Sequence, residues 1–406
     1  MLYRKHPYIS FFIWPFGALL LNILNIRASY FKNLLWMFII FYGYTFVLNS
    51  EERDADRYKN KLIEFYEQKD LSLEDIFGEV YTENYTDILQ PTVTYIISRF
   101  TNDPQILFAL FGFIFGYFYS RNIALILELI PTKLNKHETL FLTLLAFLIP
   151  IWQINGFRMW TAAHIFIFFF LKFLKHNNKK YLFGTFLTFF VHFSFIFPIV
   201  IMSIYMLLGN RTNLYFVFFL ITFFVSEVSI NFSKIVPDLP LVFQDRIESY
   251  TNQDYIDFAS SKQVQVNWYI MYRGRIIRYL LYSLLVFLYL IRSRFFKNKQ
   301  VVWNLISFTF LFASVSNLLL AQPVASLGRF IAISNLLVCI TLLLLFEYLP
   351  KKMVRIASPI IFSIISFYLI IEIRIGFDTM GTSTIALNPF IAPFINENIP
   401  LIDFFK

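Results

Sequence analysis

The sequence predicts an all-α membrane protein with many transmembrane segments, and its composition and the distribution of its apolar residues carry that prediction. Of 406 residues, 58% are hydrophobic and only 15% are charged, whereas soluble domains carry about 25% charged residues. The apolar residues form long blocks such as Ile340–Phe346, without the alternation typical of barrel strands. Because lipid offers the backbone no hydrogen-bond partners, helices are the structure that remains.

Apolar blocks of membrane-helix character recur about twelve times along the chain. We expect one integral membrane domain over residues 1–406, with outer loops at 49–103 and 231–267. The predicted segments are 8–26, 33–48, 104–120, 138–153, 159–175, 181–192, 194–208, 213–231, 268–291, 301–320, 328–348 and 353–373.

The positions of lysine and arginine set the expected orientation, because cytoplasmic loops are enriched in both. Three basic clusters should be cytoplasmic, which places both outer loops and both termini outside. Arg4 and Lys5 oppose this assignment, but two charges are outweighed by three clusters, and no signal-peptide cleavage site follows them. The clusters are Lys172, Lys175, Lys179 and Lys180; Arg292, Arg294, Lys297 and Lys299; and Lys351, Lys352 and Arg355.

The stretch 181–208 has cytoplasmic charges at both ends, Lys179–Lys180 before it and Arg211 after it. It must therefore return to the side where it began. At about 1.5 Å per residue, each half reaches only about 16–22 Å, less than the roughly 30 Å hydrocarbon core. We predict a re-entrant-like hairpin with its apex at His192–Ser194.

Within the first outer loop, Leu62, Ile63, Phe65 and Tyr66 alternate with charges in the pattern of an amphipathic helix lying on the membrane surface. A short apolar helix should follow Pro91, over 92–100, and Asp103–Pro104 should start the next membrane segment.

Arginines near the predicted outer boundary are the leading candidates for a binding site. Burying an arginine in a span costs at least about 2.5–3.5 kcal/mol, and several guanidinium groups at one interface could bind phosphate or pyrophosphate. The alternative is snorkelling to lipid headgroups. Arg158 stands out because Gly156 interrupts the helix beside it. The full set is Arg53, Arg57, Arg158, Arg273, Arg275, Arg278 and Arg329.

Two histidines are further candidates. His192, at the predicted apex, could act as a general base, since imidazole titrates near neutral pH; a structural polar group is the equal alternative. His164, which follows Arg158 by six residues, is more consistent with a structural role.

Other classes of site lack sequence support. Asp54 and Asp56 resemble a metal-binding pair, but solvated charge in an acidic loop is the better interpretation, so we expect no metal and no cofactor. The lone Cys339 lies in an apolar run and cannot form an intrachain disulfide. No nucleotide-phosphate, serine-hydrolase or zinc-protease motif is present, and no nucleic-acid-binding module.

Five short motifs, in order over about residues 35–350, resemble the EpsG family of Wzy-like polymerases of bacterial exopolysaccharide and O-antigen. Met159 departs from the pattern, because many relatives have glutamine after the central arginine. The motifs are Asp54-Ala-Asp56-Arg57-Tyr58, Asp87-Ile-Leu-Gln-Pro91, Asn155-Gly-Phe-Arg158-Met-Trp-Thr-Ala162, Val191-His192-Phe-Ser194 and Gly328-Arg329-Phe330.

This resemblance implies a glycosyltransferase in the bacterial cytoplasmic membrane that polymerises undecaprenyl-diphosphate-linked repeat units on the outer side. His192, Arg158 and Asp54 would be catalytic, with Asp54 or Asp87 as the alternative base to His192. The expected partners are lipid-linked oligosaccharides, membrane lipids and a candidate chain-length regulator. An O-antigen-ligase-like enzyme and a flippase of lipid-linked saccharide are the alternatives. The expected substrate-binding residues are Arg57, Tyr58, Asp87, Arg273, Arg275 and Arg329.

Overall fold

The computed structural model describes residues 6–48, 54–75, 87–130, 133–225, 267–292, 300–322, 325–346, 351–395 and 397–405, and these residues form helices with no strand beyond isolated bridges. The chain's contacts group it into two compact units, and the single membrane domain stays a prediction. Each unit is described by itself.

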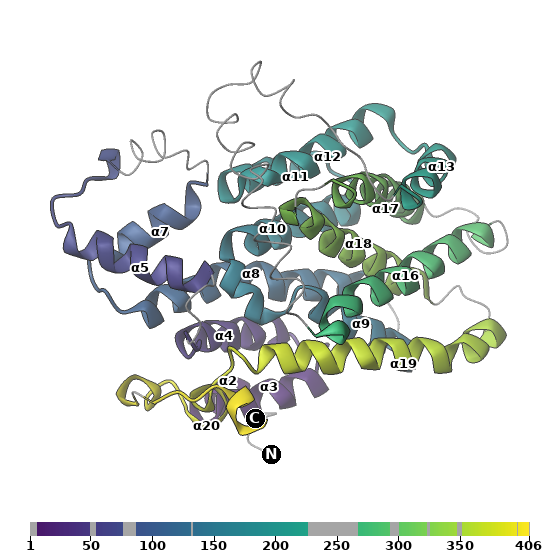
Figure 1. Ribbon diagram of the computed structural model, residues 1–406. Coiled ribbons are helices and arrows are strands. Elements are labelled where there is room, and N and C mark those ends of the chain that lie inside the picture. The colour runs from purple at the N-terminus through teal and green to yellow at the C-terminus, as the bar shows by residue number, and fades with distance from the viewer. Residues whose placement is uncertain are drawn as a thin grey trace. The chain divides into compact units, whose positions relative to one another are not determined.

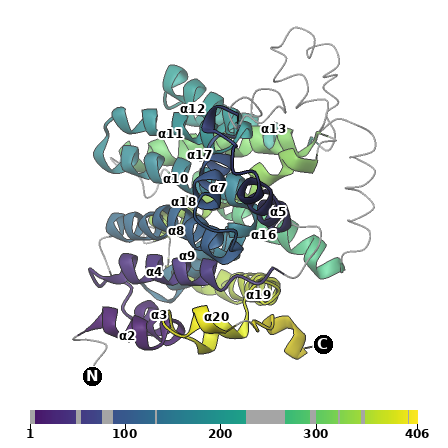
Figure 2. The ribbon, with the colours of Figure 1, turned by 90° about the vertical axis from the view of Figure 1, so that its left-hand side faces the viewer.

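The first unit comprises Met1–Pro131, Pro150–Phe193 and Glu372–Lys406. Figures 1 and 2 show its helices stacked in the order α3, α4, α8, α10 and α11, with each packing on the next. The bounds are α2 (Pro7–Ile13), α3 (Pro15–Leu24), α4 (Phe31–Tyr44), α5 (Asp54–Glu67), α7 (Leu89–Ser98), α8 (Pro104–Leu129), η1 (Ile151–Gly156), α10 (Phe157–His176), α11 (Lys180–Val191), α20 (Thr382–Ala386), η8 (Ala392–Phe394) and η9 (Leu401–Phe405).

Glycines allow α4 and α8 to approach closely. A Cβ at Gly43 would lie 2.2 Å from the carbonyl oxygen of Phe108, and one at Gly112 would lie 2.5 Å from that of Ile39. Small residues at such crossings are typical of membrane helices, whose association depends on close packing. α8 begins as predicted: the Asp103 carboxylate accepts the Gln105 amide at 2.8 Å, and Pro104 occupies the first helical turn.

α5 and α7 pack on each other within the 49–103 segment; a helix was predicted for each, and α7 begins at Leu89, before the predicted start at 92. α5 buries Ala55, Tyr58, Leu62 and Phe65, and the Phe65 ring meets the Tyr95 ring of α7. The Arg99 guanidinium donates to the carbonyls of Phe65, Gln68 and Lys69, which satisfies the C-terminus of α5. The apolar face of α5 therefore packs on protein, where we had expected the membrane surface.

The C-terminal segment is bonded to the end of α4. Asn398 Nδ2 donates to the Thr45 carbonyl at 2.7 Å, and the hydroxyls of Thr45 and Thr384 lie 2.8 Å apart. Phe46 forms a bridge with Met380. The C-terminal segment and the chain leaving α4 toward α5 thus lie at the same end of this unit.

The second unit comprises Thr132–Ile149 and Ser194–Ile371. α18 is its core, buried almost all round and packed on α9, α16 and α17. α13 and α12 pack on α17. The bounds are α9 (Lys136–Leu148), α12 (Ile196–Leu208), α13 (Thr212–Phe223), α16 (Trp268–Leu290), α17 (Gln300–Leu320), η6 (Ala325–Arg329), α18 (Phe330–Leu345) and α19 (Lys351–Gly376), whose last residues belong to the first unit.

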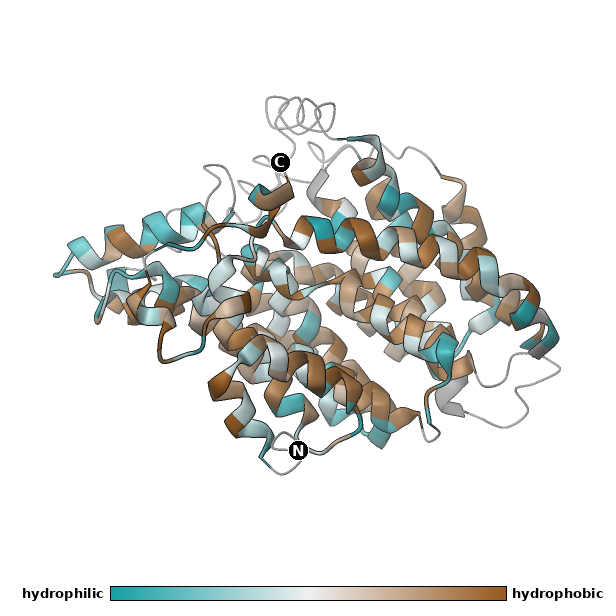
Figure 3. Cartoon of the chain, turned by 90° about the horizontal axis from the view of Figure 1, so that it is seen from below, coloured by the Kyte–Doolittle hydropathy of each residue, from teal (hydrophilic) through white to brown (hydrophobic). Residues whose placement is uncertain are grey.

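Five stretches among the described residues are long and apolar enough to cross a membrane, so the predicted total of twelve is not confirmed. Shorter apolar helices such as α11 and α13 account for several of the remaining segments. Figure 3 shows apolar residues on the outer faces of helices as well as between them, which is consistent with lipid contact. The five are Pro104–Leu129, Lys136–His176, Trp303–Leu320, Leu327–Leu345 and Val354–Gly376.

Two predicted segments are interrupted. We predicted one helix over 8–26, but the chain is extended at Trp14, between α2 and α3, because Pro15 disfavours the helical conformation in the residue before it. The predicted break at 192–194 is confirmed: α11 ends at Val191, His192 is extended, and α12 begins at Ile196. The return of the second half to the side of the first stays a prediction.

Candidate functional site

The backbone around Arg158 changes from a 3-10 helix to an α-helix. η1 ends at Gly156, and α10 begins at Phe157, so Arg158 lies in the first turn of α10. A Cβ at Gly156 would lie 2.9 Å from the Trp160 ring, which explains the glycine sterically. The Asn155 side chain accepts the Ala55 amide of α5 at 3.1 Å. The Asn-Gly-x-Arg motif therefore holds the N-terminus of α5 beside that of α10.

Asp87 is fixed against the end of α11. It precedes α7, and the amide of the next residue, Ile88, donates to the Phe190 carbonyl at 2.9 Å. Its carboxylate is buried, with 3% of the side chain exposed. A buried carboxylate must be compensated by charges or hydrogen bonds.

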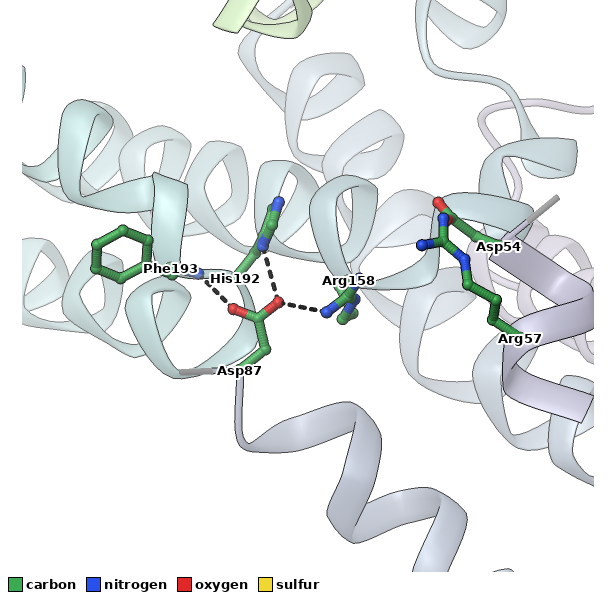
Figure 4. Close-up of polar contacts among 6 residues, drawn as sticks. All are labelled: Asp54, Arg57, Asp87, Arg158, His192 and Phe193. Carbon is green, nitrogen blue, oxygen red and sulfur yellow. Dashed lines mark hydrogen bonds and ion pairs between the residues drawn. The ribbon is translucent and has the colours of Figure 1, made fainter. Parts of the chain in front are cut away.

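Three donors from two distant parts of the chain compensate Asp87 (Figure 4). Oδ2 accepts Arg158 Nη1 at 2.9 Å and lies 3.0 Å from His192 Nδ1. Oδ1 accepts the backbone N–H of Phe193 at 2.7 Å. We call Asp87, Arg158 and His192 the ionic cluster. Because Arg158 is paired with a buried acid, headgroup snorkelling does not explain it.

The pKa of Asp87 reflects a balance of opposed effects. Burial alone would raise the pKa, but the charge and hydrogen bond of His192, the charge of Arg158 and the Phe193 amide outweigh burial and lower the pKa to about 2. With three hydrogen bonds and so low a pKa, Asp87 is a poor proton acceptor near neutral pH. The sequence alternative of Asp87 as general base therefore lacks physical support.

Aromatic rings pack close to Arg158. The Tyr58 ring packs edge-on to Phe111 at 5.5 Å, and Phe157 stacks on the same ring at 4.0 Å. The Tyr58 hydroxyl interacts with the Arg158 guanidinium. Burial raises the pKa of Tyr58, so it remains a neutral hydroxyl at working pH. Tyr58 was predicted to bind substrate; its side chain is buried, and the substrate role stays a prediction.

Asp54 and Arg57 form a separate pair at the start of α5. Arg57 Nη2 contacts Asp54 Oδ1, and the Arg57 side chain is 74% exposed. Asp54 influences both Tyr58 and Arg158 through its charge, and no hydrogen bond joins it to either among the described contacts. Figure 4 shows the pair to one side of Arg158, with the Asp87–His192 contact on the other.

The remaining predicted arginines that the structure describes belong to the second unit. Arg273, Arg275 and Arg278 lie in the first half of α16, and Arg329 ends η6. Arg275 and Arg329 are exposed, whereas the Arg278 Nε is buried. Their relation to the ionic cluster stays a prediction. Arg53 lies outside the described residues.

His164 is structural in character. His164 is buried between the rings of Phe115 and Tyr119, and its carbonyl accepts Asn122 Nδ2 at 2.9 Å. Met159, which replaces the glutamine of the resembled pattern, is also buried.

Two contributions to the site were missed by sequence reasoning. The Phe193 amide becomes a donor only because α11 ends at Val191, and Asn155 is a cap for a helix that lies about a hundred residues earlier in the chain. The helix break was predicted, and it is the signal that exposes backbone donors. Nothing in the sequence pointed to the pairing of Asn155 with α5.

The described residues contain no group of three or more His, Cys, Asp or Glu side chains able to hold a metal ion. Two open pockets lie on the first unit. One is lined by His6, Pro7, Tyr8, Ile9, Ser29 and Tyr30, and the other by residues between Glu67 and Asp75. Neither is lined by a residue of the ionic cluster.

The fold and cluster together define an all-helical protein with helices able to cross a membrane, holding a buried aspartate that joins an arginine and a histidine. Comparison of the chain with protein-family models, curated proteins and solved structures found no match.

Proposed function

We propose that this protein is a membrane glycosyltransferase that polymerises polyprenyl-diphosphate-linked oligosaccharide repeat units outside the cytoplasmic membrane. One observation carries the proposal: Asp87, Arg158 and His192, from three separate sequence motifs, meet at a single carboxylate. These are motifs on which the resemblance to EpsG-like polymerases rests. The contact among residues from three of these motifs supports the proposal that the motifs form one site.

In this proposal His192 is the general base. Its Nδ1 faces the Asp87 carboxylate, which holds that nitrogen as the N–H donor and leaves Nε2 with the lone pair. No hydrogen bond of Nε2 is found among the described residues, and the side chain is 13% exposed. An acceptor hydroxyl that reaches Nε2 can give up its proton there.

Asp87 is a positioning residue in this scheme. It fixes the tautomer and orientation of His192 as the base takes a proton. The Phe193 amide and Arg158 hold the carboxylate in turn. This assignment replaces the predicted role of Asp87 in substrate binding.

Arg158 provides donors for the leaving diphosphate. A guanidinium has five N–H groups; one contacts Asp87, and the Tyr58 hydroxyl takes part in another contact. The remaining N–H groups can bind a phosphate oxygen. Pairing with Asp87 neutralises part of the Arg158 charge, so a further cation is needed, and exposed Arg57 of the same unit is the candidate.

The reaction balances without an added co-reactant. The bond between the donor's anomeric carbon and the diphosphate oxygen breaks, and a bond forms from that carbon to the acceptor hydroxyl oxygen. His192 Nε2 takes the hydroxyl proton and later releases it to solvent. The electron pair of the broken bond stays on the diphosphate, where cationic N–H donors stabilise it.

Deleting the gene and separating lipid-linked glycans on a gel tests the proposal. A polymerase predicts accumulated single repeat units that an external glycosidase can digest. Single units protected from that enzyme would indicate a flippase, and full-length polymer that is not attached to its acceptor would indicate a ligase. An unchanged glycan profile would contradict all three.

A further inference from the structure

One face of α11 is an unbroken apolar stripe. Phe183, Phe186, Leu187 and Phe190 are 73%, 47%, 54% and 49% exposed. Their spacing of three, one and three residues places them on one side of a helix. We call these four residues the α11 stripe.

The opposite face of α11 packs on α10 and takes up the polar side chains. Leu182, Thr185, Thr188 and Val191 are buried, and each threonine hydroxyl donates to a carbonyl one turn earlier, Thr185 to Leu182 and Thr188 to Thr185. Beyond Lys180 at its start, the exposed face therefore offers no hydrogen-bonding side chain and suits an apolar occupant.

The stripe leads directly to the ionic cluster. The carbonyl of Phe190, its last member, accepts the amide of Ile88, the neighbour of Asp87. Two residues further on, His192 contacts the Asp87 carboxylate. α11 has 12 residues, so it is about 18 Å long, shorter than the roughly 30 Å hydrocarbon core. Because α11 ends within that thickness, a lipid chain that lies along α11 can place its headgroup beside the end of the helix.

We propose that the α11 stripe binds the polyprenyl chain of the lipid-linked donor and thereby places its diphosphate at Arg158. This inference rests on the proposed function. Both ends of such an amphiphile are matched: an apolar chain by four large apolar side chains, and an anionic diphosphate by the guanidinium at the end of the stripe. Exposed apolar residues of α8 and α16 also lie beside arginines, Arg121 and Arg275, but neither arginine belongs to the ionic cluster.

The experiment measures binding of two probes to the purified full-length protein in nanodiscs: undecaprenyl diphosphate, which has a long chain, and geranyl diphosphate, which has a short one. The variant is Phe183→Ala/Phe186→Ala/Leu187→Ala, which leaves Phe190 and the cluster intact. The matched control is Leu20→Ala/Leu21→Ala/Leu24→Ala, on an exposed apolar face of α3. α3 is a suitable control because it packs on the beginning of α4, where Asn22 Nδ2 donates to the Phe31 carbonyl, and not on α11.

We expect the α11 variant to weaken binding of the long-chain probe about tenfold or more, because apolar contact area is lost. Binding of geranyl diphosphate should change less than about twofold in the same variant, and the α3 control should bind both probes normally. Equal losses for both probes, or equal effects of the α3 and α11 variants, would overturn the inference in favour of bulk-lipid contact.

The outcome is separable from the test of the proposed function. If the α11 variant binds the long-chain probe normally while gene deletion still accumulates single repeat units, the stripe assignment fails and the polymerase stands. If chain-length-dependent binding is lost as expected but deletion leaves lipid-linked glycans unchanged, the stripe stands as a polyprenyl-diphosphate site and polymerisation fails.

Discussion

Asp87 is the residue on which the candidate site depends. It is the common acceptor for a side chain of α10, the histidine after α11 and a backbone amide. A buried carboxylate with these partners is held ionised, and removing it would leave Arg158 without its counter-charge. Its effects on stability and on chemistry can be separated by pH and by substitution.

The first residue-level prediction concerns Asp87→Asn. The folded pKa, about 2, lies below the ordinary value of 3.8, so the ionised carboxylate contributes stability fully above pH 3.8 and loses it as pH falls toward 2. That component is about 2 kcal/mol. We expect the variant to be less stable at pH 6 and to lose less stability than wild type between pH 4 and pH 2.

Thermal unfolding in detergent, followed by circular dichroism across that pH range, makes the measurement. Asp70→Asn, at an exposed acid of the same loop, is the control and should follow wild type. If Asp87→Asn and wild type lose stability in parallel on acidification, the carboxylate is not held ionised by its neighbours.

The second residue-level prediction separates His192 from Arg158. His192→Ala should slow polymerisation by about 10²–10⁴-fold, the usual contribution of a positioned base, with near-normal donor affinity. Arg158→Ala should lower affinity and rate together. Arg158→Lys should rescue poorly, because a point charge cannot replace the fork that contacts both Asp87 and Tyr58.

Purified-protein activity and donor binding, compared with protein abundance, decide this prediction. If His192→Ala lowers abundance but leaves normal activity per folded molecule, His192 is structural. Wild-type polymer length in cells carrying Arg158→Ala would exclude the role of Arg158 in diphosphate binding.

At the scale of elements, interruptions of the helices position the ionic cluster. α10 starts after the 3-10 turn η1, and α11 ends at Val191, just before His192. Each break puts a charged side chain or a free amide at a helix end, where backbone donors are available. The short helices are thus part of the site, since a continuous span through 181–208 would have kept the Phe193 amide within its own helix.

The element-level prediction compares two glycines. Gly156→Ala should destabilise the protein by about 1–3 kcal/mol, because the new Cβ would lie 2.9 Å from the Trp160 ring, and it should weaken the docking of α5. Gly274→Ala on α16 is the control: nothing lies within 4 Å of its Cβ, and alanine favours a helix by about 1 kcal/mol over glycine.

Thermal stability in detergent and proteolysis of the 54–98 region report the two effects. Equal stability of both variants would show that the space at Gly156 is not constrained by Trp160. Destabilisation without faster cleavage of α5 would show that the turn does not hold that helix.

At the scale of the whole molecule, bonds tie distant parts of the chain to one end of the first unit. The C-terminal segment is bonded to Thr45 and Phe46 at the end of α4. Asp87 of the ionic cluster lies in the segment that follows α4. The predicted outer location of the first loop and of the C-terminus is therefore internally consistent: if one lies outside, so does the other.

Cysteine labelling in intact cells tests this topology. Cys339 is fully buried, so the wild-type chain should give little signal. Cysteines at positions 82 and 394 should both react with an impermeant thiol reagent, and one at position 298 should not. Position 394 is now held by a phenylalanine that is 82% exposed. Opposite labelling of 82 and 394 would contradict the bonded arrangement, and labelling of 298 alone would reverse the orientation.

The sequence by itself determined the helical class, the membrane character and most helix positions, because hydropathy blocks, proline and capping residues act locally. Pro104 with Asp103 fixed the start of α8, and the charges flanking 181–208 predicted the break at His192. It also singled out Arg158 and His192 as candidates, since charges next to apolar segments are costly wherever they fold.

Tertiary structure alone decided which of these residues lie in contact. Asp87 lies 71 residues from Arg158 and 105 from His192, and no local pattern records such a pairing. It also made Asp87 the buried acceptor for Arg158, His192 and the Phe193 amide, and it buried Tyr58. The physical reason is that a residue's pKa, free donors and exposure depend on the neighbours that packing supplies, whereas its helix propensity and hydropathy belong to the chain itself.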